Sequence, residues 1–194
     1  GLEGESAEGV LPGVEFLRRV NLSGGSLVSG KVVVIGGGNV AIDVARVALR
    51  SGWKDVTIVY RRTREEMPAA PMEVHHVDQE GVRLIFLAAP TRILSRDGQL
   101  TGVEFVRMDL GEEDESGRRS PQPVPGSEFI LEADVLVPAV GQKSIPVYDP
   151  TVKVEVTPRG TYVVDPVTLQ TSVEWIFAGG DTVLGPKTVA KAVC

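Results

Sequence analysis

The feature that most constrains the fold is a run of β-branched residues that ends directly in three glycines. Lys31 to Ile35 reads KVVVI, and Gly36-Gly37-Gly38 follows it. An uninterrupted run of this kind is typical of a strand buried on both faces of a parallel sheet. From Asn39 the apolar residues recur at helical spacing, and Asp55 to Tyr60 is a second apolar run. The sequence therefore predicts a strand–helix–strand unit with parallel strands.

The segment Gly36 to Ala41 fits the pattern G-x-G-x-x-A. Between a strand and a helix, this pattern predicts a turn that binds the diphosphate of a dinucleotide. Gly36 allows the tight turn, Gly38 lets the diphosphate approach the backbone without meeting a Cβ, and Ala41 keeps the helix close to the sheet. The free N–H groups at the start of the helix then face the anion. The alternative is a glycine turn that serves packing alone. The cofactor-binding residues expected here are Gly36, Gly37, Gly38, Asn39, Val40 and Ala41.

Three arginines follow the second strand, where an NAD-specific site usually carries an acidic residue for the ribose 2′-hydroxyl. The segment reads Tyr60-Arg61-Arg62-Thr63-Arg64, with no carboxylate at the strand end. A guanidinium group suits a phosphate because its planar fork donates two hydrogen bonds at once. We therefore expect Arg61, Arg62 and Arg64 to favour NADPH over NADH. In the alternative interpretation these arginines merely pair with Glu65 and Glu66.

Beyond this unit the pattern changes from parallel to antiparallel strands. A short helix is expected from Met72 to Glu80, a strand from Arg83 to Leu87, and a last buried strand from Val135 to Val140. We interpret the acidic, proline-containing stretch 111–127 as a solvated loop, with an acidic protein-binding site as the alternative. Turn signals separate three strands of an antiparallel meander, expected at Thr91–Ser95, Val103–Met108 and Phe129–Leu131.

Together these elements predict the α/β class, a Rossmann-like three-layer dinucleotide-binding domain made of a parallel sheet and an antiparallel β-meander. Further short strands are expected near residues 152–156, 162–164 and 175–178. Residues 1–30 are rich in glycine and serine, and we interpret them as a connector with one or two helical turns.

Composition narrows the function. A formal net charge of −6 and an aromatic content of 5% argue against a nucleic-acid-binding protein. No apolar run approaches the roughly 20 residues that cross a bilayer, so we expect no membrane span and a cytoplasmic protein. The one cysteine, Cys194, excludes an internal disulfide or a cysteine-held iron–sulfur cluster within these 194 residues. His75 and His76 have no ligand-spaced partners, so no metal site is expected.

The longer segment from Lys31 through Tyr60-Arg61-Arg62 to Glu66-Met67-Pro68-Ala69 resembles the small (β) subunit of NADPH-dependent glutamate synthase. The relatives of that subunit include the flavoprotein of ferredoxin:NADP transhydrogenases and the reductase region of dihydropyrimidine dehydrogenases. Glu80-Gly81-Val82 and Gly1-Leu2-Glu3-Gly4 are also similar, so the resemblance covers essentially the whole chain. It implies a flavoprotein that passes hydride from NADPH to FAD, and electrons on to iron–sulfur centres or a partner subunit.

Two later segments resemble motifs of flavoproteins with two dinucleotide domains. Pro138-Ala139-Val140-Gly141-Gln142 is similar to the motif that returns the chain from the NAD(P)H domain to the FAD domain. Thr171, followed by Ile176 to Asp181, resembles the second FAD motif, whose aspartate binds the ribityl chain. The alternative for Asp181 is a simple turn residue. The resemblance thus implies four further cofactor-binding residues, Ala139, Gly141, Gly180 and Asp181.

The chain departs from that family in two respects. Nothing in residues 1–30 matches the first FAD motif, and the cysteine-rich iron–sulfur region is missing. We therefore expect a piece of a larger reductase, whose missing partners are the rest of the FAD domain and an iron–sulfur region or large subunit. Its parts are a connector or FAD-domain stub at 1–23, an NAD(P)H-binding domain at 24–142, and a partial FAD-binding domain at 143–194. Alone it should bind nucleotide without holding FAD tightly.

No catalytic side chain is expected, because hydride transfer is the chemistry of the cofactors and the protein positions them. Two other functions stay open. One is a domain that senses a dinucleotide without redox chemistry. The other is the NADPH domain of a thioredoxin reductase, although that enzyme needs a C-x-x-C pair that this chain lacks. Met67 and Pro68 are expected either to line the adenine side of the pocket or to pack.

Overall fold

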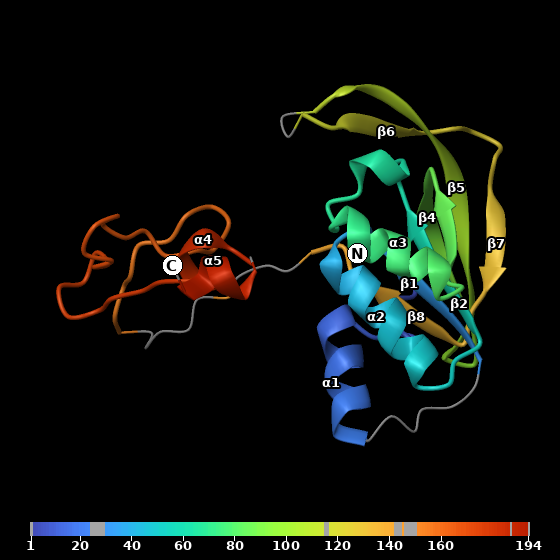
Figure 1. The fold of residues 1–194 in the computed structure, drawn as a ribbon, viewed down its shortest axis with the longest axis horizontal. Coiled ribbons are helices and arrows are strands. Elements are labelled where there is room, and N and C mark those ends of the chain that lie inside the picture. Colours follow the sequence, from blue (N-terminus) through green and yellow to red (C-terminus); the bar gives the residue numbers. More distant parts are fainter. Residues whose placement is uncertain are drawn as a thin grey trace. The chain divides into compact units, whose positions relative to one another are not determined.

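The computed structural model describes residues 2–23, 30–114, 117–141, 145, 151–186 and 188–193. The chain divides into two compact units, Gly1–Val140 and Gly141–Cys194, both visible in Figure 1. The first unit holds the strand–helix–strand motif and both sheets. The three functional parts predicted from the sequence stay a prediction, and residues 1–23 lie within the first compact unit.

A four-stranded parallel sheet forms the centre of the first unit, in the order β3-β2-β1-β8. β1 pairs in parallel with β2 on one side and with β8 on the other. The predicted strand–helix–strand unit is therefore confirmed. The strand bounds are β1 (Lys31–Ile35), β2 (Asp55–Tyr60), β3 (Arg83–Phe86) and β8 (Val135–Pro138), so β8 ends two residues before the predicted Val140.

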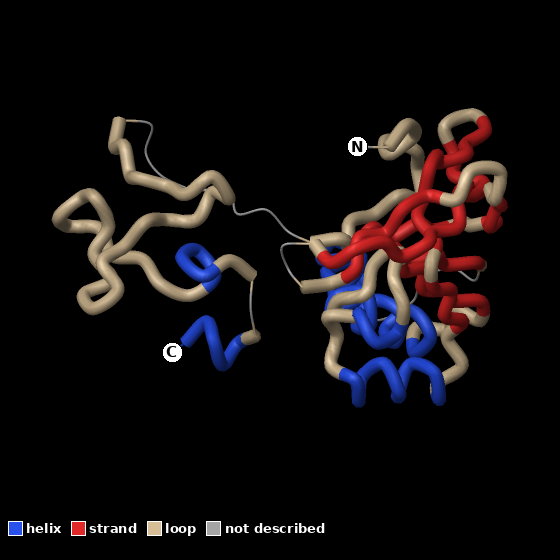
Figure 2. Tube along the Cα trace, turned by 90° about the horizontal axis from the view of Figure 1, so that it is seen from above, coloured by secondary structure: helices blue, strands red, loops and turns tan. Residues whose placement is uncertain are grey.

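The run KVVVI is buried because both faces of the sheet are covered. Alternate residues of a strand point to opposite faces. Val32 and Val34 accordingly join the apolar core between the parallel sheet and the helices. Val33 and Ile35 point to the opposite face and join a second core, which the antiparallel sheet described below covers. Within the first unit, Figure 2 shows the helices gathered on one side of the strands. These helices are α1 (Gly13–Ser23), α2 (Asn39–Arg50) and α3 (Pro71–Gln79), and a 3-10 turn, η1 (Arg64–Glu66), precedes α3.

The helix α1 is longer than the one or two turns predicted for the connector. It spans 11 residues and buries Phe16 and Val20 in the core that α2 also covers. Phe16 and Val20 are four positions apart and therefore lie on one helix face. The strand-like backbone before α1 also bonds to the sheet, since the Leu136 N–H donates to the Gly9 carbonyl at 2.9 Å. Residues 2–23 thus pack as part of the first unit.

The antiparallel sheet forms the third layer and confirms the predicted meander. Its long central strand, β5, pairs antiparallel with β4, β6 and β7. The strand bounds are β4 (Ala88–Arg96), β5 (Gln99–Glu113), β6 (Arg119–Pro123) and β7 (Phe129–Glu132).

The prediction of a solvated loop over residues 111–127 was wrong. β5 continues to Glu113, and β6 pairs back on it from Met108↔Pro123 to Glu113↔Arg119. Composition does not distinguish the two, because an edge strand with little apolar cover can have the same charged and proline-rich residues as a loop. Proline is tolerated on an edge strand, where its missing N–H faces away from the sheet. We call the described residues of this stretch, 108–114 and 117–123, the β5–β6 arm.

The second unit has little regular structure and little core. It contains α4 (Asp181–Leu184), α5 (Val189–Val193) and isolated bridges such as Val156↔Tyr162, in place of the predicted short strands. Among its described residues Val154 is the only buried apolar one, while Trp175 is 71% exposed and Phe177 61% exposed. None of the helices in the described parts of the chain has the length and apolar character needed to cross a bilayer.

Candidate functional site

The glycine turn lies at the carboxyl end of β1, one of the two central strands of the parallel sheet. From β1 the chain passes through α2 to β2, while β8 pairs on the opposite side of β1. In open α/β sheets ligands bind beside the carboxyl ends of the strands, at the point where the connections diverge to either side. The predicted glycine residues therefore lie at the position where such a sheet binds its ligand.

The first two glycines are required by the packing of the protein itself. Gly36 has φ +143°, and a Cβ there would lie 2.4 Å from the Ala139 carbonyl oxygen. A Cβ on Gly37 would lie 2.6 Å from the ring of Tyr60. Only a residue without a side chain fits at either position. The turn thus brings Ala139 of the predicted return motif against Gly36, and the Ala139 N–H donates to the Ile35 carbonyl at 2.7 Å.

Gly38 is different, because no protein atom crowds it. The nearest atom to a Cβ added at this position would be Cγ of Pro68 at 4.0 Å, and the Gly38 φ of −92° suits any residue. Packing therefore does not explain this glycine. A bare backbone at Gly38 leaves room for a group from outside the chain, which is what the pattern predicts for the diphosphate.

The start of α2, which begins directly after Gly38, carries backbone N–H groups without an acceptor among the described residues. The first internal bonds of α2 come from Ala41 and Ile42, and both reach the Gly38 carbonyl. The preceding N–H groups, those of Gly38, Asn39 and Val40, have no acceptor among the described residues. Asn39 is oriented by its side chain, whose Oδ1 accepts the Ala70 N–H at 3.3 Å. A helix start with free N–H groups attracts an anion.

The three predicted arginines have three different surroundings. Arg62 is 2% exposed, and its guanidinium donates to Asp114 Oδ2 at 2.5 Å and to the Arg119 carbonyl at 2.6 Å. Arg64 pairs with Asp78 at 3.0 Å and lies over the Phe86 ring at 5.5 Å. Arg61 is exposed and has no ion-pair or hydrogen-bond partner within the described chain. Of the three, Arg61 alone has a guanidinium available for a ligand.

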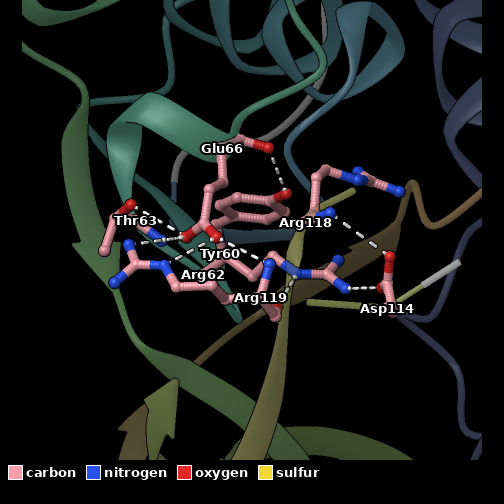
Figure 3. A network of polar contacts seen from close by, with 7 residues as sticks. All are labelled: Tyr60, Arg62, Thr63, Glu66, Asp114, Arg118 and Arg119. Atoms are coloured by element: carbon pink, nitrogen blue, oxygen red, sulfur yellow. Dashed lines mark hydrogen bonds and ion pairs between the residues drawn. The ribbon is translucent and has the colours of Figure 1, made fainter. Parts of the chain in front are cut away.

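The partners of Arg62 come from the β5–β6 arm, the stretch whose composition predicts a solvated loop. Asp114 lies 52 residues further along the chain. No local spacing signals such a contact, because it depends on how the arm folds back against the segment that follows β2. The arm also reaches Glu66, whose Oε1 accepts the Arg119 N–H at 3.1 Å (Figure 3).

Glu66 organises the turn that follows the arginines. Its Oε2 accepts the Thr63 hydroxyl at 3.0 Å, and its carbonyl accepts the Tyr60 hydroxyl at 2.8 Å (Figure 3). Burial by itself raises the pKa of this carboxyl, but the hydrogen bonds from Thr63 and Arg119 outweigh burial and hold the pKa below its ordinary value. The carboxylate is therefore stabilised in its charged form.

The Glu66→Gln variant is expected to lose more stability at neutral pH than in acid. The depressed pKa means that the ionised carboxyl stabilises the fold fully above its unfolded pKa near 4.5, and that this contribution is lost as the pH falls through the folded pKa. At pH 7 we expect a loss of about 1–2 kcal/mol in the free energy of unfolding. Urea titrations at pH 7 and pH 3 measure the difference. A difference that stays the same at pH 3 contradicts the prediction.

The remaining predicted residues divide between the units. Gly141 is exposed with φ +120°, and Gln142 lies outside the described residues. In the second unit, Gly180 has φ +63° and Asp181 begins α4. Met67 is buried in the core, whereas Pro68 is exposed beside Gly38. No group of three or more His, Cys, Asp or Glu side chains among the described residues is placed to hold a metal ion.

Comparison with protein families finds a match to the family described as pyridine nucleotide-disulphide oxidoreductase, over residues 1–194. The chain is 52% identical to the NADP(+)-dependent formate dehydrogenase subunit beta of Moorella thermoacetica, over 98% of this chain and 27% of that protein. It is 44% identical to the NADPH-Fe(3+) oxidoreductase subunit beta of Geobacter sulfurreducens, over 100% of this chain and 32% of that protein. It is 42% identical to the glutamate synthase [NADPH] small chain of Azospirillum brasilense, over 84% and 34%.

The resemblance to glutamate synthase small subunits is thus confirmed, and the chain spans about a third or less of the length of these relatives. Among solved structures, T. acidophilum thioredoxin reductase matches with a TM-score of 0.75 and 25% identity, over 100% of this chain and 57% of that one. Mycobacterium tuberculosis FprA in complex with NADPH matches with a TM-score of 0.75 and 19% identity, over 97% and 56%. These similarities confirm the predicted Rossmann-like fold of two-dinucleotide flavoproteins.

Proposed function

The chain belongs to the pyridine nucleotide-disulphide oxidoreductase family, and from that premise we propose that residues 24–142 bind NADPH within a larger flavin-dependent oxidoreductase. In this proposal NADPH donates a hydride to FAD, and the electrons pass on to iron–sulfur centres or a partner subunit. The side chains of this chain bind and orient the dinucleotide. They take no part in acid–base chemistry, because the hydride moves between cofactors.

The observation that carries the proposal is the open glycine turn. A Cβ added at Gly38 would have no protein atom within 4 Å except Pro68 Cγ at 4.0 Å, and the N–H groups at the start of α2 have no acceptor among the described residues. A diphosphate fits both features, since it needs close backbone approach and donors that satisfy its oxygens. Asn39, Val40 and Ala41 then belong to the binding turn as predicted.

The names of the relatives support NADPH as the dinucleotide. The Moorella protein is named for NADP(+), and the Geobacter and Azospirillum proteins are named for NADPH. In this chain the exposed Arg61, at the end of β2, would contact the 2′-phosphate. Arg62 has no direct contact with the phosphate in this proposal, because its guanidinium is buried and bound to Asp114.

The three relatives are named for three different reactions, which involve formate, ferric iron and glutamate. What their matching parts share with this chain is the dinucleotide side of each reaction, so the final electron acceptor is set elsewhere in the whole protein. Two of the three are named as β subunits, which supports a partner subunit. A cytoplasmic location stays a prediction.

The second unit supports the proposed partial FAD domain. A folded unit usually buries its large apolar side chains, but Trp175 and Phe177 are largely exposed and Val154 is the only buried apolar residue among those described. Such a surface fits a unit completed by further chain. Ala139 and Gly141 of the return motif, and Gly180 and Asp181 of the second FAD motif, keep their proposed cofactor-binding roles on the resemblance alone.

Calorimetric titration of the chain with NADPH and with NADH tests the dinucleotide assignment. We expect NADPH to bind at least about tenfold more tightly than NADH, because one charge-assisted contact to the 2′-phosphate contributes about 1.5–3 kcal/mol. Equal affinities, or no binding of either, would contradict the assignment. A sensing role would instead predict that a flavin-loaded full-length protein shows no bleaching when NADPH is added.

The Arg61→Ala variant is expected to lose most of the preference for NADPH. Removal of the exposed guanidinium should weaken NADPH binding about 10- to 100-fold and leave NADH binding within about twofold. Arg64→Ala is the matched control, because Arg64 lies three residues away and is already paired with Asp78. Competition titrations at one salt concentration compare the variants, since salt weakens exposed charge contacts. If Arg64→Ala has the larger effect, Arg61 is not the phosphate ligand.

A further inference from the structure

We propose that the Arg62–Asp114 ion pair positions Arg61, so that the β5–β6 arm determines the preference for NADPH without touching the nucleotide. The inference rests on the proposed function, and it assigns a role to two residues outside the glycine turn. Arg62 and Asp114 act as positioning residues in this view.

Arg62 is buried more deeply than the carboxylate that pairs with it. The Arg62 side chain is 3% exposed, while Asp114 is 34% exposed. A guanidinium cannot lose its proton in a protein, so burial without a counter-ion is costly. Asp114 supplies that counter-ion, and the Arg119 carbonyl accepts the Nε–H at 2.6 Å. Arg62 can therefore stay inside only while the arm lies against it.

The backbone of Arg62 is also held by a hydrogen bond. Arg62 follows Arg61 directly, and its carbonyl accepts the Leu87 N–H at 3.2 Å. The arm therefore holds the side chain of Arg62, and Leu87, between β3 and β4, holds its carbonyl. The exposed side chain of Arg61 then starts from a backbone that cannot turn freely.

The arm also contacts the segment after β2 at a second residue, Glu66. Arg119 of the arm also donates to Glu66, through its backbone N–H at 3.1 Å and its Nε–H at 3.3 Å. Figure 3 shows the carboxylate of Glu66 between Thr63 and Arg119, and Asp114 against the guanidinium of Arg62. The arm thus holds the segment after β2 at both Arg62 and Glu66.

The consequence follows from the cost of a buried, unpaired charge. Without the Asp114 carboxylate, the Arg62 guanidinium is drawn toward water, and the backbone that it shares with Arg61 moves with it. A shift of about 1 Å in a positioning element can change an interaction that depends on geometry by as much as about 100-fold. The 2′-phosphate is the only difference between NADPH and NADH, so the affinity for NADPH should fall while the affinity for NADH stays nearly unchanged.

The test uses Asp114→Asn, the charge-retaining Asp114→Glu and a control, Asp109→Asn. Asp109 lies on the same arm, opposite Gln122, and is exposed with no ion-pair partner among the described residues. We expect Asp114→Asn to weaken NADPH binding about tenfold and NADH binding by less than about twofold. Asp114→Glu should recover part of the loss, and Asp109→Asn should bind both nucleotides as the parent chain does.

Two results would overturn the inference. If Asp114→Asn lowers the melting temperature but keeps the NADPH to NADH ratio, the pair is structural only. If the variant binds NADPH more tightly, the released Arg62 is itself a phosphate ligand. A parent chain without any NADPH preference would instead overturn the proposed function, and the inference with it.

Hydrogen exchange provides a readout without nucleotide. The amides of Glu66, Met67 and Leu87 are bonded within this segment or to it, through the carbonyls of Thr63, Arg64 and Arg62 respectively. We expect Asp114→Asn to accelerate their exchange at least about tenfold, while amides in β1 are unchanged. Unchanged exchange at all three would show that the arm does not hold the segment.

Discussion

The Gly38→Ala variant is expected to bind NADPH about 100-fold more weakly than the parent chain while folding as well. A Cβ at this position meets no protein atom closer than Pro68 Cγ at 4.0 Å, and the φ of −92° is allowed for alanine. In the proposed complex, however, the methyl group occupies the space through which the diphosphate approaches the N–H groups of α2. Two charge-assisted bonds at about 1.5–3 kcal/mol each exceed the loss that we predict.

Stability should hardly change in this variant. Replacing glycine by alanine stabilises the fold by about 0.4–1 kcal/mol, because it lowers the conformational entropy of the unfolded chain. At a helix N-cap, however, alanine is less favourable than glycine by a similar amount, so the two effects nearly cancel. Thermal unfolding without ligand and calorimetry with NADPH separate the two effects. If Gly38→Ala binds NADPH with the parent's affinity, the diphosphate does not lie against Gly38, and the proposed binding mode is wrong.

The Gly36→Ala variant is expected to lose about 4 kcal/mol of folding stability, a fall of roughly 10 °C in the melting temperature. The Cβ would lie 2.4 Å from the Ala139 carbonyl oxygen, which is backbone and cannot move without shifting the end of β8. A φ of +143° adds strain for any residue with a side chain. The Gly36 N–H also donates to the Val59 carbonyl at 3.0 Å, and this bond would be disturbed.

Gly52→Ala is the matched control for this loss. Gly52 also has a positive φ, +99°, but no atom lies within 4 Å of the place that a Cβ would occupy. This variant should therefore show the backbone strain without the clash, at about 1 kcal/mol. Melting temperatures of the parent chain, Gly36→Ala and Gly52→Ala in the same buffer separate the clash from the backbone strain. Equal losses in the two variants would mean that the contact with Ala139 contributes nothing.

The predictions that succeeded depended on local patterns. The run KVVVI could only be a strand covered on both faces, and Gly36 to Ala41 marked the change from strand period to helix period. Parallel pairing of β1 and β2 followed, because a helix must cross over between them. These features depend on sequence neighbours, so they can be inferred before any tertiary contact is known.

The prediction that failed concerned the β5–β6 arm. Its charged residues and prolines are exposed whether the stretch forms a loop or an edge hairpin. Hydrophobic periodicity therefore cannot distinguish these two structures in this stretch. The same limit applied to α1, where glycine-rich flanks concealed the burial of Phe16 and Val20. In both places the deciding contacts are with residues far away in the chain.

By itself the sequence determined a parallel strand–helix–strand unit, a glycine turn between β1 and α2, and a cluster of arginines after β2. Only the tertiary structure decided how those arginines divide, with Arg62 buried on Asp114, Arg64 on Asp78 and Arg61 left exposed. The physical reason is that a guanidinium paired with a nearby carboxylate is no longer available to a ligand. For Arg62 that carboxylate is 52 residues away, brought there by the folding of the β5–β6 arm.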